Sequence, residues 1–510
     1  MPPQPMHNTT PSTEIEPSSS PFDHTRLMVN LVSLIAALAI SLGLLVLLIG
    51  FRDSKTGFLV MGGLGGIALG TTIFFHPEVG AYVLAVTVFS NVSSIFTDAG
   101  LPGINKPLVA LTFLSIVAGR FARRQPFRVQ RTEWLLLIYA TVGLASTFFA
   151  TDRAEAIDAF IVLAKDVLIA ITIVYSVQTV QQFKITIWLI ILTTSAVALL
   201  GAYQAATGNF RNTFMGFATV TPDVTQMRLS GPVGDPNFWG QILDATLALA
   251  LFRFITEKQF WWKMLGGGTF FILLFVVINS YSRGAFMALG VILLLTVIQL
   301  RVNLKKLVAI TAVLAVLIPA ALPFLPAGFL ERMQTLTAFT DSDKSSAVYV
   351  DKSFQGRSSE MIAGLMMFRD HPILGVGIGN YEINYQDYAR KIGLEYRTEI
   401  RQAHSLYVEI ISETGILGIL AFSAVIISLF ARYRKNRREL AGVEDDWLNW
   451  DASLQIATVS YLTTSIFLHG DFFRFLTFLI AMGIASGHIS HKLWEHHQAE
   501  KSGVIMEGTA

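Results

Sequence analysis

Residues 27–50 read LMVNLVSLIAALAISLGLLVLLIG, an apolar run that carries no charged side chain. About 20 such residues are enough to cross the hydrocarbon core of a bilayer as a helix. The run follows a polar stretch rich in Pro, Ser and Thr, which we expect to be a disordered tail over 1–26. Because no small-residue cleavage pattern follows the run, we expect it to remain in the protein as a membrane span rather than to act as a signal peptide.

Apolar stretches of similar length recur along the rest of the chain. Every backbone amide inside a bilayer must be hydrogen-bonded within the protein, so these stretches are helices or strands of a closed barrel. Their apolarity is continuous rather than alternating, which favours helices. The sequence therefore predicts an all-α polytopic membrane protein with 12–14 transmembrane helices. The further expected spans are 57–75, 78–96, 106–121, 133–150, 157–177, 183–206, 236–256, 262–280, 284–300, 305–325, 405–430, 452–468 and 473–490.

The composition agrees with a membrane protein and excludes several classes of function. Hydrophobic residues make up 53% of the 510 residues and charged residues 15%, whereas soluble chains carry about 25% charged residues. A net charge of +2 provides no field that would recruit nucleic acid. The absence of cysteine excludes disulfides, thiolate metal sites and a cysteine nucleophile. Since no carboxylate cluster suggests a metal, we expect neither a metal nor a cofactor.

Three short basic connections, around 120–131, 301–306 and 432–438, set the expected orientation. Counting the spans places all three on one side, and Lys and Arg favour the cytoplasmic side of a membrane. We therefore expect both ends of the chain inside, with Arg52 and Lys55 as exceptions. The loops expected outside are 151–156, 207–235, 281–283, 326–404 and 469–472. The expected parts are a cytoplasmic tail at 1–26, a helix bundle at 27–325, a periplasmic cap loop at 326–403, C-terminal spans at 404–490 and a second cytoplasmic tail at 491–510.

The cap loop is long for a simple connection, so we expect it to fold. Residues 357–368, RSSEMIAGLMMF, show the apolar spacing of a helix. Gly375, Gly377 and Gly379 follow in a run that is typical of a flexible segment. The sequence thus predicts a helix-rich cap over the outer face of the membrane.

Three basic side chains far apart in the sequence, Arg228, Arg283 and His404, are placed on the outer side by this topology. Asp235 is a good N-cap and Pro236 a good first helical residue, so a helix N-terminus with free amides is expected to face outward there. Such a terminus, with an arginine beside it, favours an anion such as phosphate. Taken singly, each arginine is explained as well by anchoring at the membrane interface.

His404 offers chemistry that the arginines lack. A histidine with an ordinary pKa near 6.5 can take a proton from a hydroxyl at neutral pH. A single histidine is nevertheless more often structural. Glu413 follows nine residues later, about 2.5 helical turns, which places it roughly opposite His404 on one helix. We therefore assign Glu413 to helix packing rather than to a pair with His404.

Other ionisable residues are weaker candidates. Lys165 and Asp166 lie inside an expected span, where charged groups are functional candidates by default, although each can find a partner in a helix bundle. His469, Asp471 and Arg474 surround an expected outer turn, and turn chemistry explains them equally well.

Four segments together resemble the O-antigen ligase and polymerase superfamily, and more weakly its O-glycosylation ligases. They are Arg228 with GDPN at 234–237, SRGA at 282–285, GRSSEMIAGLMMFRDHPILGVGIGNY at 356–381 and AHSLYVEIISETGILG at 403–418. The resemblance implies a membrane glycosyltransferase of the C-type fold that uses neither metal nor nucleotide sugar. It implies that Arg228 and Arg283 bind a carrier diphosphate and that His404 is the essential histidine. Asp235 and Asn237 join the arginines as expected substrate-binding residues.

The function that the resemblance implies is glycan transfer from a polyprenyl-diphosphate carrier to an acceptor hydroxyl. His404 would be the general base, and direct displacement would invert the anomeric configuration. The acceptor stays open between lipid A–core, a growing glycan and a protein. The expected location is the bacterial inner membrane, in contact with membrane lipids and with the active site facing the periplasm. A polytopic transporter for a small anion such as bicarbonate is the alternative.

Overall fold

The computed structural model describes residues 55–223, 226–301, 328–334, 352–391 and 401–502, with a few single residues between 303 and 326. The chain divides into two compact units, 1–69 and 70–510, and each is described by itself. In the first unit the described part is the beginning of helix α2 (Lys55–Phe75). The expected tail at 1–26, the first span at 27–50, most of the span at 305–325 and the end of the chain from 503 lie outside the described residues.

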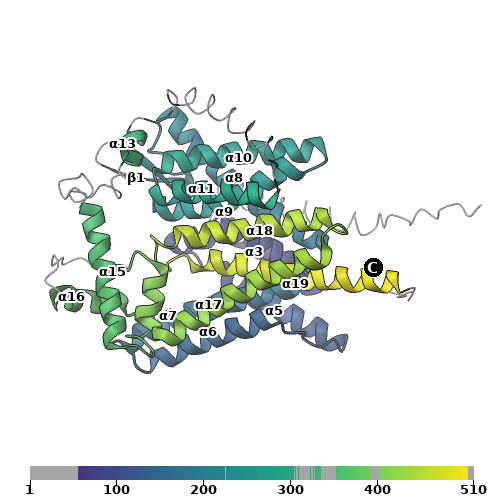
Figure 1. The fold of residues 1–510 in the computed structure, drawn as a ribbon, viewed down its shortest axis with the longest axis horizontal. Coiled ribbons are helices and arrows are strands. Elements are labelled where there is room, and N and C mark those ends of the chain that lie inside the picture. The colour runs from purple at the N-terminus through teal and green to yellow at the C-terminus, as the bar shows by residue number, and fades with distance from the viewer. Residues whose placement is uncertain are drawn as a thin grey trace, which may run out of the picture. The chain divides into compact units, whose positions relative to one another are not determined.

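From residue 70 onward, the described chain is almost entirely helical (Figure 1). Twelve helices coincide with expected spans: α3 (Pro77–Phe89), α4 (Val92–Asp98), α5 (Asn105–Ala122), α6 (Arg131–Thr147), α7 (Arg153–Ser176), α8 (Val180–Thr207), α9 (Pro236–Thr256), α10 (Phe260–Ser280), α11 (Arg283–Gln299), α17 (Leu406–Leu440), α18 (Asp445–Thr464) and α19 (Phe473–Lys501). The remaining elements are the short helix η1 (Phe214–Gly216), the strands β1 (Thr219–Pro222) and β2 (Met227–Gly231), and the helices α13 (Phe329–Gln334), α15 (Lys352–Asp370) and α16 (Tyr381–Lys391).

Several of these helices are long and apolar enough to cross a membrane. Five meet that test in the described residues, namely α8, α9, α10, α17 and α19, and a sixth span results if α3 and α4 are counted as one. The prediction of an all-α polytopic membrane protein is therefore confirmed. The total of 12–14 spans stays a prediction.

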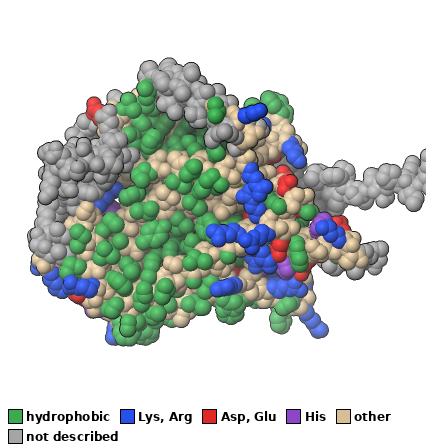
Figure 2. All heavy atoms as spheres, viewed as in Figure 1, with side chains coloured by type: hydrophobic (Ala, Val, Ile, Leu, Met, Phe, Trp, Pro, Cys, Tyr) green, Lys and Arg blue, Asp and Glu red, His purple; other side chains and the backbone are tan. Residues whose placement is uncertain are grey.

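Helices α9 and α19 form the centre of this arrangement. Helix α9 packs against α8, α10, α11 and α18, and α19 packs against α7, α17 and α18. The apolar stretch of each helix is mostly buried, as expected for helices enclosed by other helices. Helix α10 exposes large apolar side chains such as Phe271 and Phe275. Figure 2 shows hydrophobic side chains covering the middle of one face, as a lipid-facing surface requires.

The basic connections lie at one end of the helices. Arg432 Nη2 donates to Gln130 Oε1 (3.0 Å), next to the start of α6, and Arg437 Nη2 donates to the carbonyl of Gln299 (3.2 Å) at the end of α11. Figure 2 shows many Lys and Arg side chains gathered toward the end at which α19 terminates. The prediction that the three basic connections share one side is thus confirmed.

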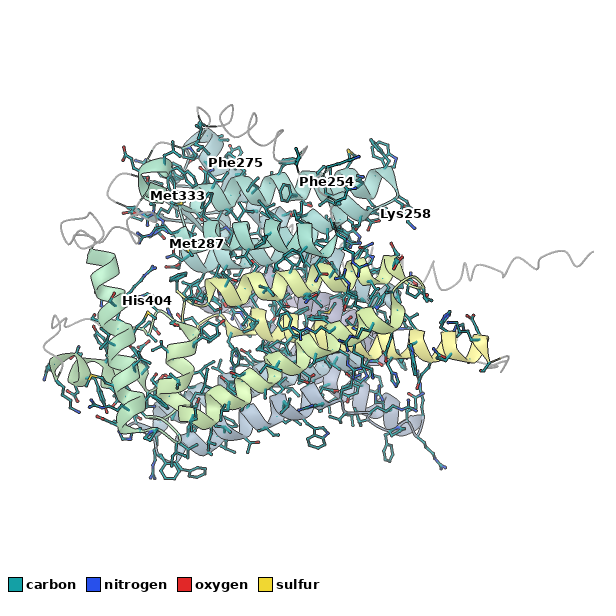
Figure 3. All side chains as sticks on the ribbon, viewed as in Figure 1. Phe254, Lys258, Phe275, Met287, Met333 and His404 are labelled. Atoms are coloured by element: carbon teal, nitrogen blue, oxygen red, sulfur yellow. The ribbon has the colours of Figure 1, made fainter. Side chains whose placement is uncertain are left out.

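The expected outer loops lie at the other end. In Figure 3, His404 lies at that end together with Met287 of α11 and Met333 of α13, whereas Lys258, between α9 and α10, lies at the opposite end. The helices of the predicted cap loop, α15 and α16, extend from the end that carries His404 (Figure 1). Helix α15 includes the helix predicted at 357–368, whereas α16 was not foreseen.

One expected span, 78–96, is broken. Helices α3 and α4 meet at 61°, at Asn91, whose left-handed φ of 55° ends the regular helix. Asn91 Nδ2 donates to the carbonyl of Pro232 (2.7 Å), and Arg474 Nη2 of α19 donates to Asn91 Oδ1 (2.6 Å). The expected span at 78–96 is therefore bent, because Asn91 bonds to the outer loop before α9 instead of continuing the helix.

The span expected at 405–430 is also broken. Within α17, Gly415 has a φ of 65° and a ψ of −160°, which interrupts the helix. The cap supplies backbone to this gap, because the amide of Gly377 donates to the carbonyl of Glu413 (3.0 Å). A Cβ on Gly415 would lie 2.3 Å from the carbonyl oxygen of Ile373, so glycine is required there.

The Glu413 side chain completes this clip between α17 and the cap. Its Oε2 accepts from the amide of Gly379 (2.9 Å) and its Oε1 from the amide of Tyr381 (3.0 Å). The glycine run, which we expected to be flexible, is instead held in place because its amides replace the helical hydrogen bonds lost at the break. Glu413 thus has a structural partner in the cap, in line with the packing role assigned to it.

Candidate functional site at the cap end of the bundle

His404 stands immediately before α17 in an unusual backbone conformation. Its φ is 45°, in the left-handed region that costs a residue with a Cβ roughly 1–2 kcal/mol. The amide of Leu406 fixes the chain there by donating to the carbonyls of Ser465 (3.0 Å) and Leu468 (2.7 Å), in the turn before α19. Strain of this kind persists where the surroundings over-determine a residue, which is common at functional sites.

Residues from two other segments surround the imidazole. Its Nε2 lies 3.7 Å from Oε2 of Glu360, a carboxylate of α15 that is only 2% exposed. Glu360 Oε1 lies 3.6 Å from Nη1 of Arg401. On the other side, the ring of His469 is 5.5 Å away and nearly perpendicular to it, and His469 Nε2 lies 2.8 Å from Oδ2 of Asp471. His404 is therefore held between the cap and the α18–α19 turn.

Burial and positive charge keep His404 uncharged. Loss of contact with water is the largest cause, and Arg357, His469 and Arg401 add to it, so the pKa of His404 falls to about 3. Asp471 acts in the opposite direction. An imidazole with this pKa is a free base across the physiological pH range. Its Nδ1 is buried and has no hydrogen-bond partner among the described residues.

Arg228 is held rigidly in β2. Its Nε donates to the carbonyl of Ser280 (2.9 Å), and its Nη2 donates to Asn237 Oδ1 (3.0 Å). The side chain is 9% exposed. Burial, followed by the charge of Arg332, lowers the pKa of Arg228 to about 10, so the guanidinium remains charged at neutral pH.

Arg332 is a cation that the sequence did not single out. Its Nε donates to the carbonyl of Tyr281 (2.9 Å), and its Nη1 donates to Asp223 Oδ2 (2.6 Å). Arg228 and Arg332 thus bind the carbonyls of two consecutive residues in the α10–α11 turn. No local sequence pattern pointed to Arg332, because its partners come from distant loops.

Asp235 and Asn237 are both engaged within the protein. Asp235 caps α9 as predicted, its Oδ1 accepting from the amides of Asn237 (2.7 Å) and Phe238 (3.1 Å), with Pro236 at the first helical position. The expectation of free amides at this helix N-terminus is therefore wrong. Proline has no N–H, and the cap carboxylate already satisfies the next two amides. The helix start positions Arg228 through the Asn237 side chain.

Arg283 is the first residue of α11, after the N-cap Ser282. Ser280 and Tyr281, whose carbonyls accept hydrogen bonds from Arg228 and Arg332, precede Arg283 by three and two residues in the chain. Arg283 and Arg228 lie at the end of the helices that also carries His404.

Arg357 of α15 links the two halves of the site. Its positive charge lowers the pKa of Arg228 and also that of His404. Both groups therefore lie within electrostatic reach of one cap arginine. A cavity of about 530 Å³ near the cap has none of Arg228, Arg283 and His404 among its lining residues, so a cavity common to all three predicted residues stays a prediction.

The protein is therefore a polytopic helical membrane protein with a buried neutral histidine and a group of arginines at the cap end. Residues 268–423 match the family model described as O-antigen ligase, which supports the resemblance to the O-antigen ligase and polymerase superfamily. The matched segment includes Arg283, the cap helices and His404, but not Arg228. A search of curated proteins found no match. The family supports a glycan-transferring enzyme of the O-antigen ligase or polymerase type.

Proposed function

We propose that this protein transfers a glycan from a polyprenyl-diphosphate carrier to an acceptor hydroxyl, with inversion at the anomeric carbon. The observation that carries the proposal is the buried His404, 3.7 Å from Glu360 of the cap, within the segment 268–423 that matches the O-antigen ligase model. Arg228 and Arg332, fixed on the carbonyls of Ser280 and Tyr281, supply candidate cations for the leaving group.

The arginines would receive the charge of the leaving group. As the acceptor oxygen bonds to the anomeric carbon, the bond between that carbon and the phosphate oxygen breaks, and negative charge grows on the polyprenyl diphosphate. Arg228 and Arg283 would bind this diphosphate, with Asp235 and Asn237 keeping Arg228 in place. Fixed cations aimed at developing charge stabilise a transition state without reorganisation. This arrangement needs no metal ion.

His404 would accept the proton of the attacking hydroxyl. Glu360, next to Nε2, is suited to hold the N–H of the neutral ring on that side, which leaves the lone pair of Nδ1 as the base. Glu360 is then a positioning residue. The carrier diphosphate would offset the charge of Arg357 and Arg401, so donor binding would raise the low pKa of His404 and strengthen the base when it is needed.

The expected location of this reaction is the periplasmic face of the bacterial inner membrane. There the donor reaches the site from the bilayer, and lipid A–core, a growing glycan or a protein supplies the hydroxyl. The same histidine and arginines serve each of these acceptors.

The test is glycan transfer by the purified protein in lipid nanodiscs, supplied with a polyprenyl-diphosphate-linked glycan and an acceptor. His404→Ala is expected to lower the rate about 10²- to 10⁴-fold, as loss of a general base does, while donor binding is retained. EDTA is expected to leave the wild-type rate unchanged. Full activity of His404→Ala, or its loss in EDTA, contradicts the proposal. Bicarbonate uptake into proteoliposomes without consumption of the lipid-linked glycan would support a transporter instead.

A further inference from the structure

A cavity of about 530 Å³ lies between the cap and the helices and is lined by Gln402 and Leu406, near His404 in the chain. Helices α6, α7 and α17, the glycine turn before α16, and the α18–α19 turn form its walls. Six of its lining residues are acidic and, among the residues that the structure describes, none of those lining it is Lys or Arg. The acidic residues are Glu155, Asp166, Glu382, Glu409, Glu413 and Asp471.

The carboxylates of this cavity differ in how many hydrogen bonds their oxygens accept. Both oxygens of Glu413 accept from cap amides, and Glu409 Oε2 accepts from the amide of Gly470 (2.5 Å). Asp166 Oδ1, by contrast, has no hydrogen-bond partner among the described residues, although its side chain is only 3% exposed. An unsatisfied buried carboxylate oxygen is costly, so its presence in a cavity wall indicates a ligand that donates hydrogen bonds.

The cavity lies near the candidate base, although His404 is not among its lining residues. Gln402 and Leu406, two residues to either side of His404, line it, and so does Asp471, whose charge acts on the imidazole. The arginines Arg357 and Arg401 also act on His404 but do not line the cavity. The cations that act on His404 are therefore distinct from the carboxylates that line the cavity.

The lining suits a saccharide better than a metal ion. No group of three or more His, Asp or Glu side chains in the described part of the chain is arranged to hold a metal. The walls include the aromatic rings of Tyr139, Tyr381 and Phe473. Apolar walls with a few fixed acceptors are typical of pockets that orient a small polar ligand. Carboxylates accept from hydroxyl and ammonium groups and repel phosphate or carboxylate groups.

We propose that this cavity binds the acceptor, and that the acceptor group it selects is a neutral or amine-bearing saccharide rather than an anionic one. The proposal rests on the proposed glycan transfer and adds the charge class of the acceptor. Asp166 and Glu382 receive the donor groups of the saccharide, and the accepting hydroxyl lies toward His404. The negative diphosphate stays on the arginine side, so the two substrates are separated by charge.

The test is equilibrium binding to the full-length protein in nanodiscs, measured by calorimetry without any glycan donor. Three probes of one size are compared: a glucosamine trisaccharide with free amines, its N-acetylated form and its 6-phosphorylated N-acetylated form. The amine form is expected to bind about tenfold more tightly than the neutral form, which corresponds to a difference of roughly one charge contact. The phosphorylated form is expected to bind most weakly. Equal binding of the three, or a preference for the phosphorylated form, overturns the proposal.

Two substitutions locate the binding site. Asp166→Asn is expected to remove most of the preference for the amine form, whereas Asp158→Asn, an exposed carboxylate on the same helix, is expected to retain it. If Asp166→Asn does not yield a monodisperse protein, Glu382→Gln on the cap helix α16 gives the same readout. An unchanged preference in the cavity variants, or an equal loss in Asp158→Asn, contradicts the assignment to this cavity.

The outcome is distinct from that of the transfer assay. Selective binding by a protein that never consumes a lipid-linked glycan would leave the cavity assignment standing and refute the proposed function. Active transfer with no charge preference among acceptors would do the reverse.

Discussion

The arginines and the cavity carboxylates near His404 differ in whether the protein supplies their hydrogen-bond partners. On the arginine side, Arg228 and Arg332 each bond to a fixed backbone carbonyl and to a side-chain oxygen. At the cavity, a buried oxygen of Asp166 has no hydrogen-bond partner among the residues that the structure describes. Arginines fixed in this way present a preformed surface to a bulky anion. An unbonded carboxylate oxygen can accept a hydrogen bond from a ligand.

The arginines are thus held in fixed positions, whereas the cavity keeps a carboxylate oxygen unbound. The cationic side costs little reorganisation when charge develops, which is what transition-state stabilisation requires. The acidic side gains hydrogen bonds only when a ligand enters, so it is suited to recognise one. Substitutions in each region and the pH dependence of the rate separate the two roles.

The largest effect is expected from Arg228→Gln. Loss of the guanidinium removes a cation from the arginine side and leaves the carbonyl of Ser280 without its donor. We expect kcat/KM for the lipid-linked donor to fall about 10²- to 10³-fold, as for the loss of one fixed donor to a developing anion, while binding of the amine-bearing saccharide is unchanged. Arg211→Gln, at an exposed arginine of the same loop, is the control. A variant that loses saccharide binding and keeps donor use would show that the two sides are assigned the wrong way round.

An intermediate effect is expected from Gly415→Ala, which disturbs the clip that forms one wall of the cavity. The left-handed φ of 65° and the 2.3 Å approach to Ile373 leave no space for a methyl group. The free energy of unfolding should fall by about 1–3 kcal/mol, the cost of a strained backbone position. Thermal unfolding of the nanodisc-embedded protein measures this.

The control for the clip is Gly119→Ala. Gly119 lies in α5 with open space around its Cβ position, so alanine there should leave the unfolding temperature unchanged or raise it. Equal unfolding temperatures for the two variants would mean that the break in α17 does not depend on glycine.

The smallest effect concerns pH. His404 acts as a base only when neutral, and its pKa of about 3 lies below its unfolded value of about 6.5. In the free enzyme, kcat/KM should therefore not fall through this group between pH 8 and pH 5. With donor bound, the diphosphate offsets Arg357 and Arg401, so the acid limb of kcat should lie about 1–3 units higher. If the acid limbs of kcat and kcat/KM coincide, the diphosphate bound by the arginines does not change the pKa of His404.

The helical spans were predictable because each is a continuous apolar run, and apolarity along the chain suffices to place it in a bilayer. The breaks at Asn91 and Gly415 were not, since both residues lie inside apolar runs and the bonds that replace the helix come from 232 and from 372–381. The Asp235 cap was predictable from local spacing. The loss of the free amides was not foreseen. The carboxylate that caps α9 accepts from the amides that were expected to bind an anion.

For the site, the sequence indicated Arg228, Arg283 and His404 through topology and through resemblance. It gave no reason to choose Glu360, Arg357 or Arg401. These lie in the cap loop, where charged residues of both signs are common, and only the packing of α15 beside His404 selects them. His469 and Asp471 were noticed in a turn, but their approach to His404 depends on how α17 and α19 meet.

The interlock between Gly415 and the glycine turn has a practical consequence for engineering. Backbone groups of the glycine turn complete the hydrogen bonds of α17 at its break. The cap and this part of α17 can therefore be exchanged between proteins only together. A chimera that imports a foreign cap must therefore import residues 409–418 with it. One built without them leaves unpaired amides facing the membrane helices, and it should be degraded before any change of acceptor can be seen.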